Sequence, residues 1–160
     1  MESSMTIPVV FRNHFQLGYV VRNLDSAIED MRDKFGVAKW QVNVMHKSAP
    51  ARALGFAYVQ QVMIELIEAR PERETIYRDW IPESDAAARL HHLGYMIDSD
   101  EEWRSTIGQF EGSGFRTAFA DSSDFFDYYY ADTLAQLGHY CELIRLKPAG
   151  RAFWASVPHN

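Results

Sequence analysis

Two stretches of this chain read alike: QLGYVV at Gln16–Val21 and HLGYMI at His92–Ile97. Both are short apolar runs of the kind that form β-strands. Each is followed by apolar residues at helical spacing, beginning near Asp25 in the first stretch and near Asp100 in the second. We expect the two aspartates to cap these helices, because a carboxylate accepts the free N–H groups of a first turn. A repeated strand–helix unit predicts two similar modules in one chain.

Three further strand-like stretches follow each predicted helix. They are residues 40–46, 54–60 and 61–68 in the first half, and 115–121, 125–131 and 139–146 in the second. The helices are expected to stop near Gly36 and near Gly112 or Gly114. Each half therefore predicts the order β-α-β-β-β, which is an α+β fold. The predicted organisation is a first module at 1–69, a connection at 70–89 with some helix around 74–80, a second module at 90–147 and a partly helical tail at 148–160.

The opening and closing strands of each half carry one polar residue among apolar neighbours. In the opening strands it is Gln16 or His92, and in the closing strands, IELI and CELI, it is Glu65 or Glu142. Side chains alternate between the two faces of a strand, so each polar residue shares the inner face with apolar residues. A buried carboxylate is costly unless it is paired or bound to a metal.

Taken singly, each of these residues reads as a solvent-facing glutamate or a hydrogen-bonded histidine. Their matching positions in two repeats favour a shared explanation, one divalent metal ion. Three oxygens and one imidazole nitrogen suit Zn, Ni, Co, Mn, Fe(II) or Mg, with open positions for water or substrate.

Composition excludes several other classes of protein. The 160 residues are 47% hydrophobic with a net charge of −6, which disfavours nonspecific binding to nucleic acid or to an anionic membrane. The single cysteine, Cys141, permits neither an internal disulfide nor a thiolate metal cluster. The segment Met1–Val10 lacks the pattern of a signal peptide, and no apolar run approaches a membrane span. We therefore expect a cytoplasmic protein.

The stretches QLGYVVRNLDSAI, LHHLGYMI, IELIEA and GHYCELIRL together resemble the glyoxalase, or vicinal oxygen chelate, superfamily over about residues 14–147. The resemblance implies two tandem βαβββ modules that form a cupped mixed β-sheet, the glyoxalase/bleomycin resistance/dihydroxybiphenyl dioxygenase fold. It also implies metal ligands at the four positions Gln16, Glu65, His92 and Glu142. Their Gln/Glu/His/Glu order is similar to the lactoylglutathione lyases, whereas LHHLGYMI and the chain length are more similar to the methylmalonyl-CoA epimerases.

The chain also departs from these relatives. The epimerases place a second catalytic glutamate in the stretch that corresponds to Val42–Ser48, where this chain offers only His46 as a proton carrier. A clear basic set for a glutathione carboxylate is missing; the candidates, expected to be solvated surface, are Arg12, Arg22 and Arg52. Gln16 in place of a histidine counts against the two-histidine, one-carboxylate iron site of extradiol dioxygenases.

The resemblance implies a lyase or isomerase that abstracts a proton next to a carbonyl, on a small molecule that presents two neighbouring oxygens to the metal. Glu142 is the preferred base and Glu65 the second, with Tyr128, Tyr130 and Tyr140 as possible pocket residues. No separate organic cofactor is implied. The alternatives are a non-catalytic drug- or ligand-binding protein and an extradiol-type dioxygenase. Exposed sheet edges predict a homodimer, with Phe153 and Trp154 as contact residues.

Overall fold

The computed structural model describes residues 9–160; most of Met1–Val10, the segment judged not to be a signal peptide, lies outside the described residues. The first repeat consists of β1 (His14–Val21), α1 (Leu24–Phe35), β2 (Gln41–Val44), β3 (Ala51–Val59) and β4 (Val62–Ala69). The second consists of β5 (Ala88–Met96), α2 (Asp100–Gly112), β6 (Thr117–Ser122), β7 (Phe126–Ala131) and β8 (Tyr140–Leu146). The remaining elements are the short helices η1 (Arg78–Trp80) and α3 (Leu134–Leu137) and the tail helix α4 (Pro148–Ser156).

All the strands belong to one mixed sheet with the order β2-β3-β4-β1-β5-β8-β7-β6. The order is symmetric about its centre, with each strand of the first half in the place of its counterpart in the second. In the first half β1 pairs in parallel with β4, and in the second β5 pairs in parallel with β8. The two halves meet along the antiparallel pair β1–β5, in which Gln16 lies opposite Gly94, Leu17 opposite Leu93 and Gly18 opposite His92. Equivalent residues thus exchange partners about a pseudo-twofold axis, which confirms the predicted α+β fold of two βαβββ units.

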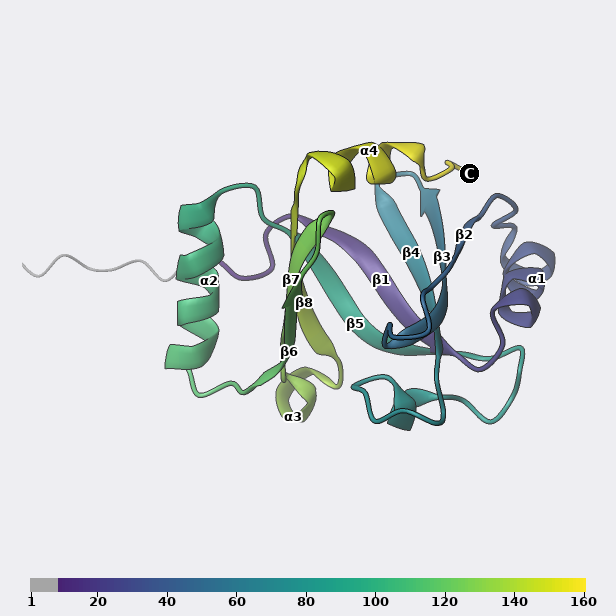
Figure 1. Cartoon of the computed structure of the whole chain (residues 1–160), viewed down its shortest axis with the longest axis horizontal. Helices are drawn as coiled ribbons and strands as arrows, with labels where there is room; N and C mark the ends of the chain where they lie inside the picture. The colour runs from purple at the N-terminus through teal and green to yellow at the C-terminus, as the bar shows by residue number, and fades with distance from the viewer. Residues whose placement is uncertain (1–8) are drawn as a thin grey trace, which may run out of the picture.

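Figure 1 shows α1 and α2 at opposite ends of the molecule, each flanking the outer side of one half of the curled sheet. Under α1, Leu24 and Ile28 pack with Tyr19 of β1 and Leu66 of β4. Under α2, Phe110 and its neighbours pack on a second core built from Tyr95, Tyr129 and Leu143. Each helix therefore seals one half of the sheet from outside and leaves the concave side for other contacts.

The helix caps differ from the sequence prediction. The helix α1 begins after Asn23, whose side chain accepts from the N–H of Ser26, and α2 begins after Ser99, whose hydroxyl accepts from Glu102. Asp25 and Asp100 lie inside the first turns instead. Asn and Ser are at least as good as Asp at an N-cap, and an acidic first turn still favours the helix dipole.

The tail forms the predicted helix, α4, and lies across both halves of the sheet. Trp154 is 8% exposed and packs with Phe56 and Met63 of the first half and with Ile144 of the second. The expectation that Trp154 contacts a partner subunit is therefore wrong, because its own chain buries it. Around 74–80, the expected helix is reduced to the single 3₁₀ turn η1.

The sheet ends in the edge strands β2 and β6, and on β2 Val44 is 83% exposed. The homodimer stays a prediction, because an uncovered edge strand favours pairing with or burial against another chain. Light scattering that gives only the 18.5 kDa mass of one chain at micromolar concentration would contradict it.

In residues 9–160 no helix is long and apolar enough to cross a membrane.

Gly150 of α4 lies where the tail helix packs closely against the backbone of the second half. A Cβ at this position would overlap the carbonyl oxygen of Phe125, which is backbone and cannot move aside easily. We expect Gly150→Ala to lower the free energy of unfolding by about 1–3 kcal/mol, as overpacking does. The measurement is urea denaturation followed by circular dichroism.

Gly108→Ala in α2 is the matched control. Within the described chain a Cβ there would meet nothing within 4 Å. It should raise the stability by about 0.5–1 kcal/mol, because alanine has the higher helix propensity. Equal effects of the two substitutions would show that α4 is not held against Phe125.

Candidate metal centre

The sheet brings together the four residues singled out in the sequence. Gln16 and His92 come from the central strands β1 and β5, and Glu65 and Glu142 come from the flanking strands β4 and β8. The register is the same in both halves: Gly18 lies beside Glu65, and Gly94 lies beside Glu142. The pseudo-twofold axis therefore places all four side chains on one concave face.

The Nε2 atom of His92 lies at the centre of the group. It is 3.2 Å from Oε2 of Glu65, 3.1 Å from Oε2 of Glu142 and 3.3 Å from Oε1 of Gln16. Gln16 and His92 are fully buried, and Glu142 is 4% exposed. The amide nitrogen of Gln16 points to Sδ of Met63 at 3.5 Å, which leaves its oxygen directed at the histidine.

Two glycines make room for this arrangement. A Cβ on Gly18 would overlap the imidazole ring of His92, the residue directly opposite on β5. A Cβ on Gly94 would come within 2.7 Å of Oε1 of Gln16. The missing side chain of Gly18 thus leaves space for His92, and that of Gly94 leaves space for Gln16.

A second histidine orients the first. Nε2 of His91 is 3.0 Å from the carbonyl oxygen of Ile76, which can only accept, so this nitrogen carries a hydrogen. Burial, with a contribution from His92, lowers the pKa of His91 to about 2, so its ring is neutral and its Nδ1 is an acceptor. Nδ1 of His92, at 3.0 Å, therefore donates to it. The free electron pair of a neutral His92 then faces the three oxygens.

A β-bulge explains how two consecutive strand residues come into contact. Gly18 pairs with His92 but Tyr19 pairs with Leu90, so His91 is the extra residue of β5. A bulge of this kind re-aims a side chain. Strict alternation, as assumed from the sequence, would have sent His91 to the opposite face, which is why the sequence analysis did not single it out.

The electrostatics of the group call for a positive charge at its centre. Burial by itself lowers the pKa of His92, but the carboxylates of Glu142 and Glu65 outweigh it and raise this pKa to about 9. Burial also raises the pKa of Glu65, and the nearby charge of Glu142 adds to the effect. Three oxygens and one nitrogen lone pair repel each other unless a proton or a metal cation lies between them.

The residues fit a divalent cation. Glu65, His92 and Glu142 each offer one ligand atom, and these atoms lie within 4.8 Å of one another. Oε2 of Glu142 is buried, and Nε2 of His92 lies 3.1 Å from it. When His92 is neutral, with its hydrogen on Nδ1, this oxygen has no donor among the described residues, and a bound cation would satisfy it. Gln16 adds a third oxygen as the fourth ligand, and the set matches the preferences of first-row divalent metals.

The group lies in the wall of a cavity of about 360 Å³. Gln16, Glu65 and Glu142 form its polar part, and most of the remaining wall is apolar or aromatic. Tyr77 and Tyr130 also line it, and their hydroxyl oxygens are 3.2 Å apart. Burial, together with the charge of Glu142, raises the pKa of both phenols well above the usual range, so both keep their protons.

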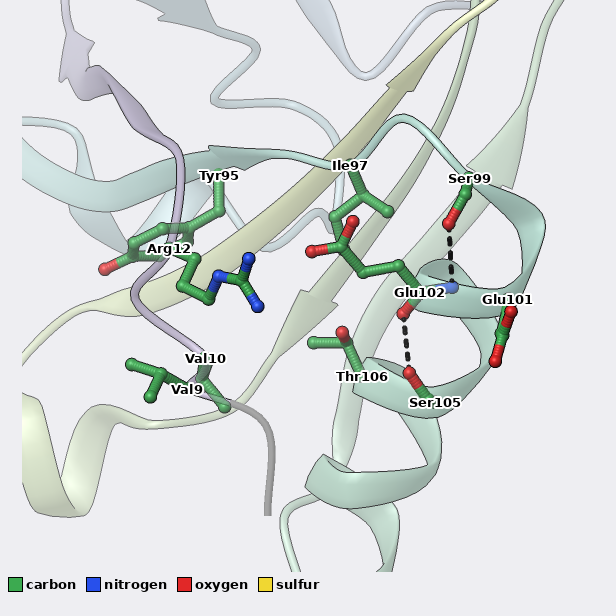
Figure 2. Close-up of a pocket in the computed structure, with 10 residues that line it drawn as sticks. All are labelled: Val9, Val10, Arg12, Tyr95, Ile97, Ser99, Glu101, Glu102, Ser105 and Thr106. Atoms are coloured by element: carbon green, nitrogen blue, oxygen red, sulfur yellow. Dashed lines mark hydrogen bonds between the residues drawn. The ribbon is translucent and has the colours of Figure 1, made fainter. Parts of the chain in front are cut away.

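The other residues considered from the sequence are divided between the cavity and the surface. Tyr128 and Tyr130 line the cavity, whereas Tyr140 packs against His91 and Trp80. His46 is exposed and contacts Ser48. The three arginines lie elsewhere: Arg12 lines a separate pocket beside α2 with Glu101 and Glu102 (Figure 2), Arg22 donates to the carbonyl of Pro82, and Arg52 pairs with Glu68 and Glu72.

Sequence comparison identifies the family. Residues 15–129 match the model of the Glyoxalase/Bleomycin resistance protein/Dioxygenase superfamily. The comparison with curated proteins finds no match.

Several solved structures share the fold at low identity. Methylmalonyl-CoA epimerase from Mycobacterium tuberculosis is 16% identical, with a TM-score of 0.65, and the match covers 93% of this chain and 97% of that one. A methylmalonyl-CoA epimerase in complex with methylmalonyl-CoA is 14% identical, with a TM-score of 0.63 over 86% and 96% of the two chains. A variant epimerase from Streptomyces coelicolor, in complex with 2-nitronate-propionyl-CoA, is 13% identical, with a TM-score of 0.62 over 84% and 96%.

The contact between the two histidines predicts a role for His91 in metal affinity. His91→Phe keeps a ring among the surrounding aromatic residues but removes the nitrogen that accepts from His92. We expect its affinity for Zn²⁺ to fall about 10–100-fold, because the partner of a ligating histidine fixes its ring and tautomer. Competition with a chromophoric chelator measures the affinity.

His91→Gln is the conservative control, since its amide oxygen can accept the same hydrogen bond. It should recover part of the lost affinity, and circular dichroism should show that both variants are folded. Wild-type affinity in a folded His91→Phe would mean that packing alone holds His92 in place.

Proposed function

Because this chain belongs to the glyoxalase/bleomycin resistance protein/dioxygenase superfamily, we propose that it is a metal-dependent enzyme of the lyase or isomerase type, which moves a proton on the carbon next to a carbonyl. The observation that supports this most is the convergence of three oxygens on Nε2 of His92 in the wall of a cavity large enough for a small molecule. Such a site combines a cation-binding group with carboxylates that can carry a proton.

Gln16, Glu65, His92 and Glu142 would hold the metal. When bound, a divalent cation supplies Lewis acidity, which polarises a carbonyl and stabilises the negative charge that forms when the neighbouring carbon loses its proton. A substrate with two adjacent oxygens fits this role. The surrounding apolar wall excludes water, and this strengthens electrostatic interactions inside the cavity.

Glu142 is the proposed base, with Glu65 as the second candidate. With His92 neutral, Oε2 of Glu142 accepts no hydrogen bond from the described residues, so this oxygen is available for a proton. Glu65 is its symmetry equivalent, and its raised pKa also suits a carboxylate that must be protonated during a cycle. Tyr77 and Tyr130 share a hydrogen bond between their hydroxyls, so the phenol that accepts in this pair can donate its own proton to an oxygen of the substrate.

The structural relatives favour an isomerase over a lyase. The epimerases named above act on a CoA thioester, and an epimerisation needs proton removal on one face and return on the other. The two carboxylates of this chain come from opposite halves of the sheet, so they can serve the two faces of one carbon. His46, the proton carrier noted in the stretch around β2, is exposed and outside the cavity wall, so it has no part in this proposal.

Two alternatives are kept. A non-catalytic ligand-binding protein would use the same cavity, and purified protein without stoichiometric metal would favour it. A dioxygenase would require Fe(II) and oxygen consumption with catechols, and the glutamine at position 16 argues against it. Metal analysis of the purified protein, followed by chelator treatment, separates the binding protein from the main proposal, and oxygen consumption with catechols separates the dioxygenase.

If Glu142 is the base, its substitution should reduce proton transfer much more than metal binding. Glu142→Gln keeps the size of the side chain and one coordinating oxygen, so it should retain much of the metal. It should still lose about 10²–10⁴-fold in proton transfer, the usual effect of removing a general base. The measurement is solvent deuterium uptake next to the carbonyl of hydroxyacetone, 2-hydroxyacetophenone and methylmalonyl-CoA, alongside metal content.

Glu65→Gln is the matched control, because it removes the symmetry-equivalent carboxylate. A larger loss in Glu65→Gln than in Glu142→Gln would transfer the role of the base to Glu65. If both variants hold metal and exchange deuterium at the wild-type rate, neither glutamate is the base.

A further inference from the structure

The wall of the cavity is poor in charged side chains, although charged residues make up 24% of the chain. Apart from the metal-binding group, most of it consists of aromatic and aliphatic side chains of β3, β4, the β6–β7 hairpin, β8 and α4, and its other polar members are Asn43 and Ser123. Within residues 9–160 no lysine or arginine belongs to it. At its border Phe125 is 45% exposed, so the apolar surface extends to solvent.

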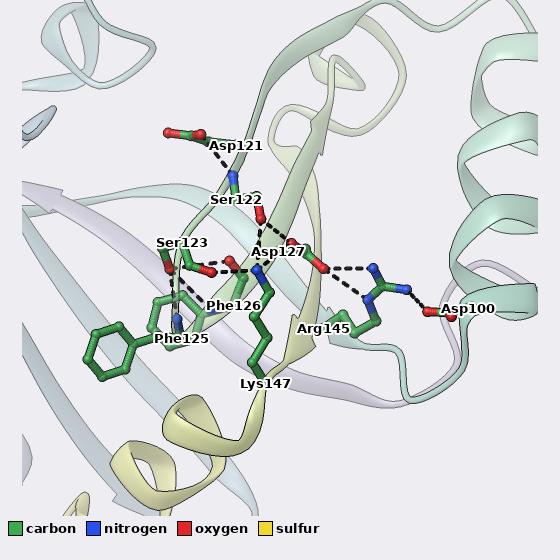
Figure 3. Close-up of polar contacts among 9 residues, drawn as sticks. All are labelled: Asp100, Asp121, Ser122, Ser123, Phe125, Phe126, Asp127, Arg145 and Lys147. Atoms are coloured by element: carbon green, nitrogen blue, oxygen red, sulfur yellow. Dashed lines mark hydrogen bonds and ion pairs between the residues drawn. The ribbon is translucent and has the colours of Figure 1, made fainter.

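Two cations that lie a few residues from the cavity wall in sequence, Arg70 and Lys147, are engaged elsewhere. Arg70 donates to the carbonyl oxygens of Ala49 and His46, at 3.1 and 3.2 Å. Lys147 contacts Ser122 and Ser123 and lies 3.3 Å from Asp127, which also pairs with Arg145 (Figure 3). Arg70 also lies 3.8 Å from a carboxylate oxygen of Glu72, so both cations have a carboxylate partner within this chain.

The same network fixes the aromatic wall. Ser123 accepts from the N–H groups of Phe125 and Phe126, and Lys147 holds Ser123 through its carbonyl oxygen (Figure 3). The turn between β6 and β7 is therefore anchored to the start of α4. Two aromatic side chains of this turn, Phe125 and Phe126, line the cavity together with Phe153 of that helix. A wall held in this way is preorganised for an apolar ligand.

The metal-binding group does not supply a positive charge either. Its two carboxylates carry −2 together, and a divalent cation brings the sum to zero. An anionic group on the body of a ligand would thus be buried without a cation to pair with, and this is costly in an apolar cavity.

We propose that the substrate is a small neutral molecule whose two adjacent oxygens meet the metal-binding group and whose remaining body is apolar, the size of an aryl ring, and free of carboxylate or phosphate. This deepens the proposed function and rests on it for the position of the oxygens. It differs from the CoA thioesters bound by the structural relatives, whose carrier is rich in phosphate.

The experiment uses ligands that share one head group. Isothermal titration calorimetry with the zinc-loaded full-length protein compares 2-hydroxyacetophenone, its 3- and 4-carboxy derivatives, and hydroxyacetone, which lacks the ring. We expect 2-hydroxyacetophenone to bind at least about tenfold more tightly than either carboxylate, because each buries an unpaired charge. It should also bind at least about tenfold more tightly than hydroxyacetone, because the ring buries apolar surface.

Asn43 allows the charge preference to be reversed. It is half-buried in the cavity wall on the edge strand β2, outside the metal-binding group, so a substitution there disturbs little packing. Asn43→Lys should bring the carboxylates to within about threefold of 2-hydroxyacetophenone or better, since a surface-side cation can pair with them. Asn43→Leu, which adds no charge, should keep the wild-type order.

The outcomes separate this inference from the proposed function. Carboxylates that bind wild-type protein as tightly as 2-hydroxyacetophenone would overturn the inference, and so would hydroxyacetone of equal affinity. Protein that binds no metal but keeps the preference for the neutral ring would overturn the metal-dependent function and leave the inference standing. Retained metal and deuterium exchange with a preference for the carboxylates would do the reverse.

Discussion

The close approach of the His92 ring to the backbone of Gly18 is the constraint on which the rest of the site depends. Opposite residues of an antiparallel pair have Cβ atoms only about 5 Å apart, so an imidazole that crosses to the partner strand needs a position with no Cβ. The same relation holds between Gln16 and Gly94, because the two strands are related by the pseudo-twofold axis. Each module thus leaves the space into which the other module places its polar side chain.

That packing also determines the electrostatics. With the ring of His92 over β1, its Nε2 faces Gln16, Glu65 and Glu142. Burial disfavours every charge in the group, yet the mutual attraction of a histidinium and two carboxylates raises the pKa of His92. A site that holds a proton this firmly in the absence of another cation is suited to exchanging it for a metal.

Much of this could be predicted from the sequence because it is written as a repeat. The pairs Gln16–His92 and Glu65–Glu142 occupy matching places in two βαβββ units, and alternation along a strand is enough to put them on one face. His91 could not be found in this way, since a single-residue bulge reverses alternation and leaves no mark in the sequence. The sequence predicts the connection after β4 as a linker with some helix around 74–80, but not that it supplies the carbonyl oxygen of Ile76 and the phenol of Tyr77. Contacts made by irregular backbone have no period from which to infer them.

These two features break the symmetry of the frame in the same place. The repeat equivalent of His91 is Phe15, which cannot accept a hydrogen bond, so only the second module has an imidazole whose orientation is fixed by a neighbour. The linker adds Tyr77 beside Tyr130, and the charge of Glu142 acts on both phenols more strongly than that of Glu65. Two glutamates at equivalent backbone positions therefore have different surroundings. The proposed reaction, which removes a proton from one face of a carbon and returns it to the other, uses two carboxylates in matched positions. A duplicated fold supplies the matched positions, and the bulge and the linker give each carboxylate its own surroundings.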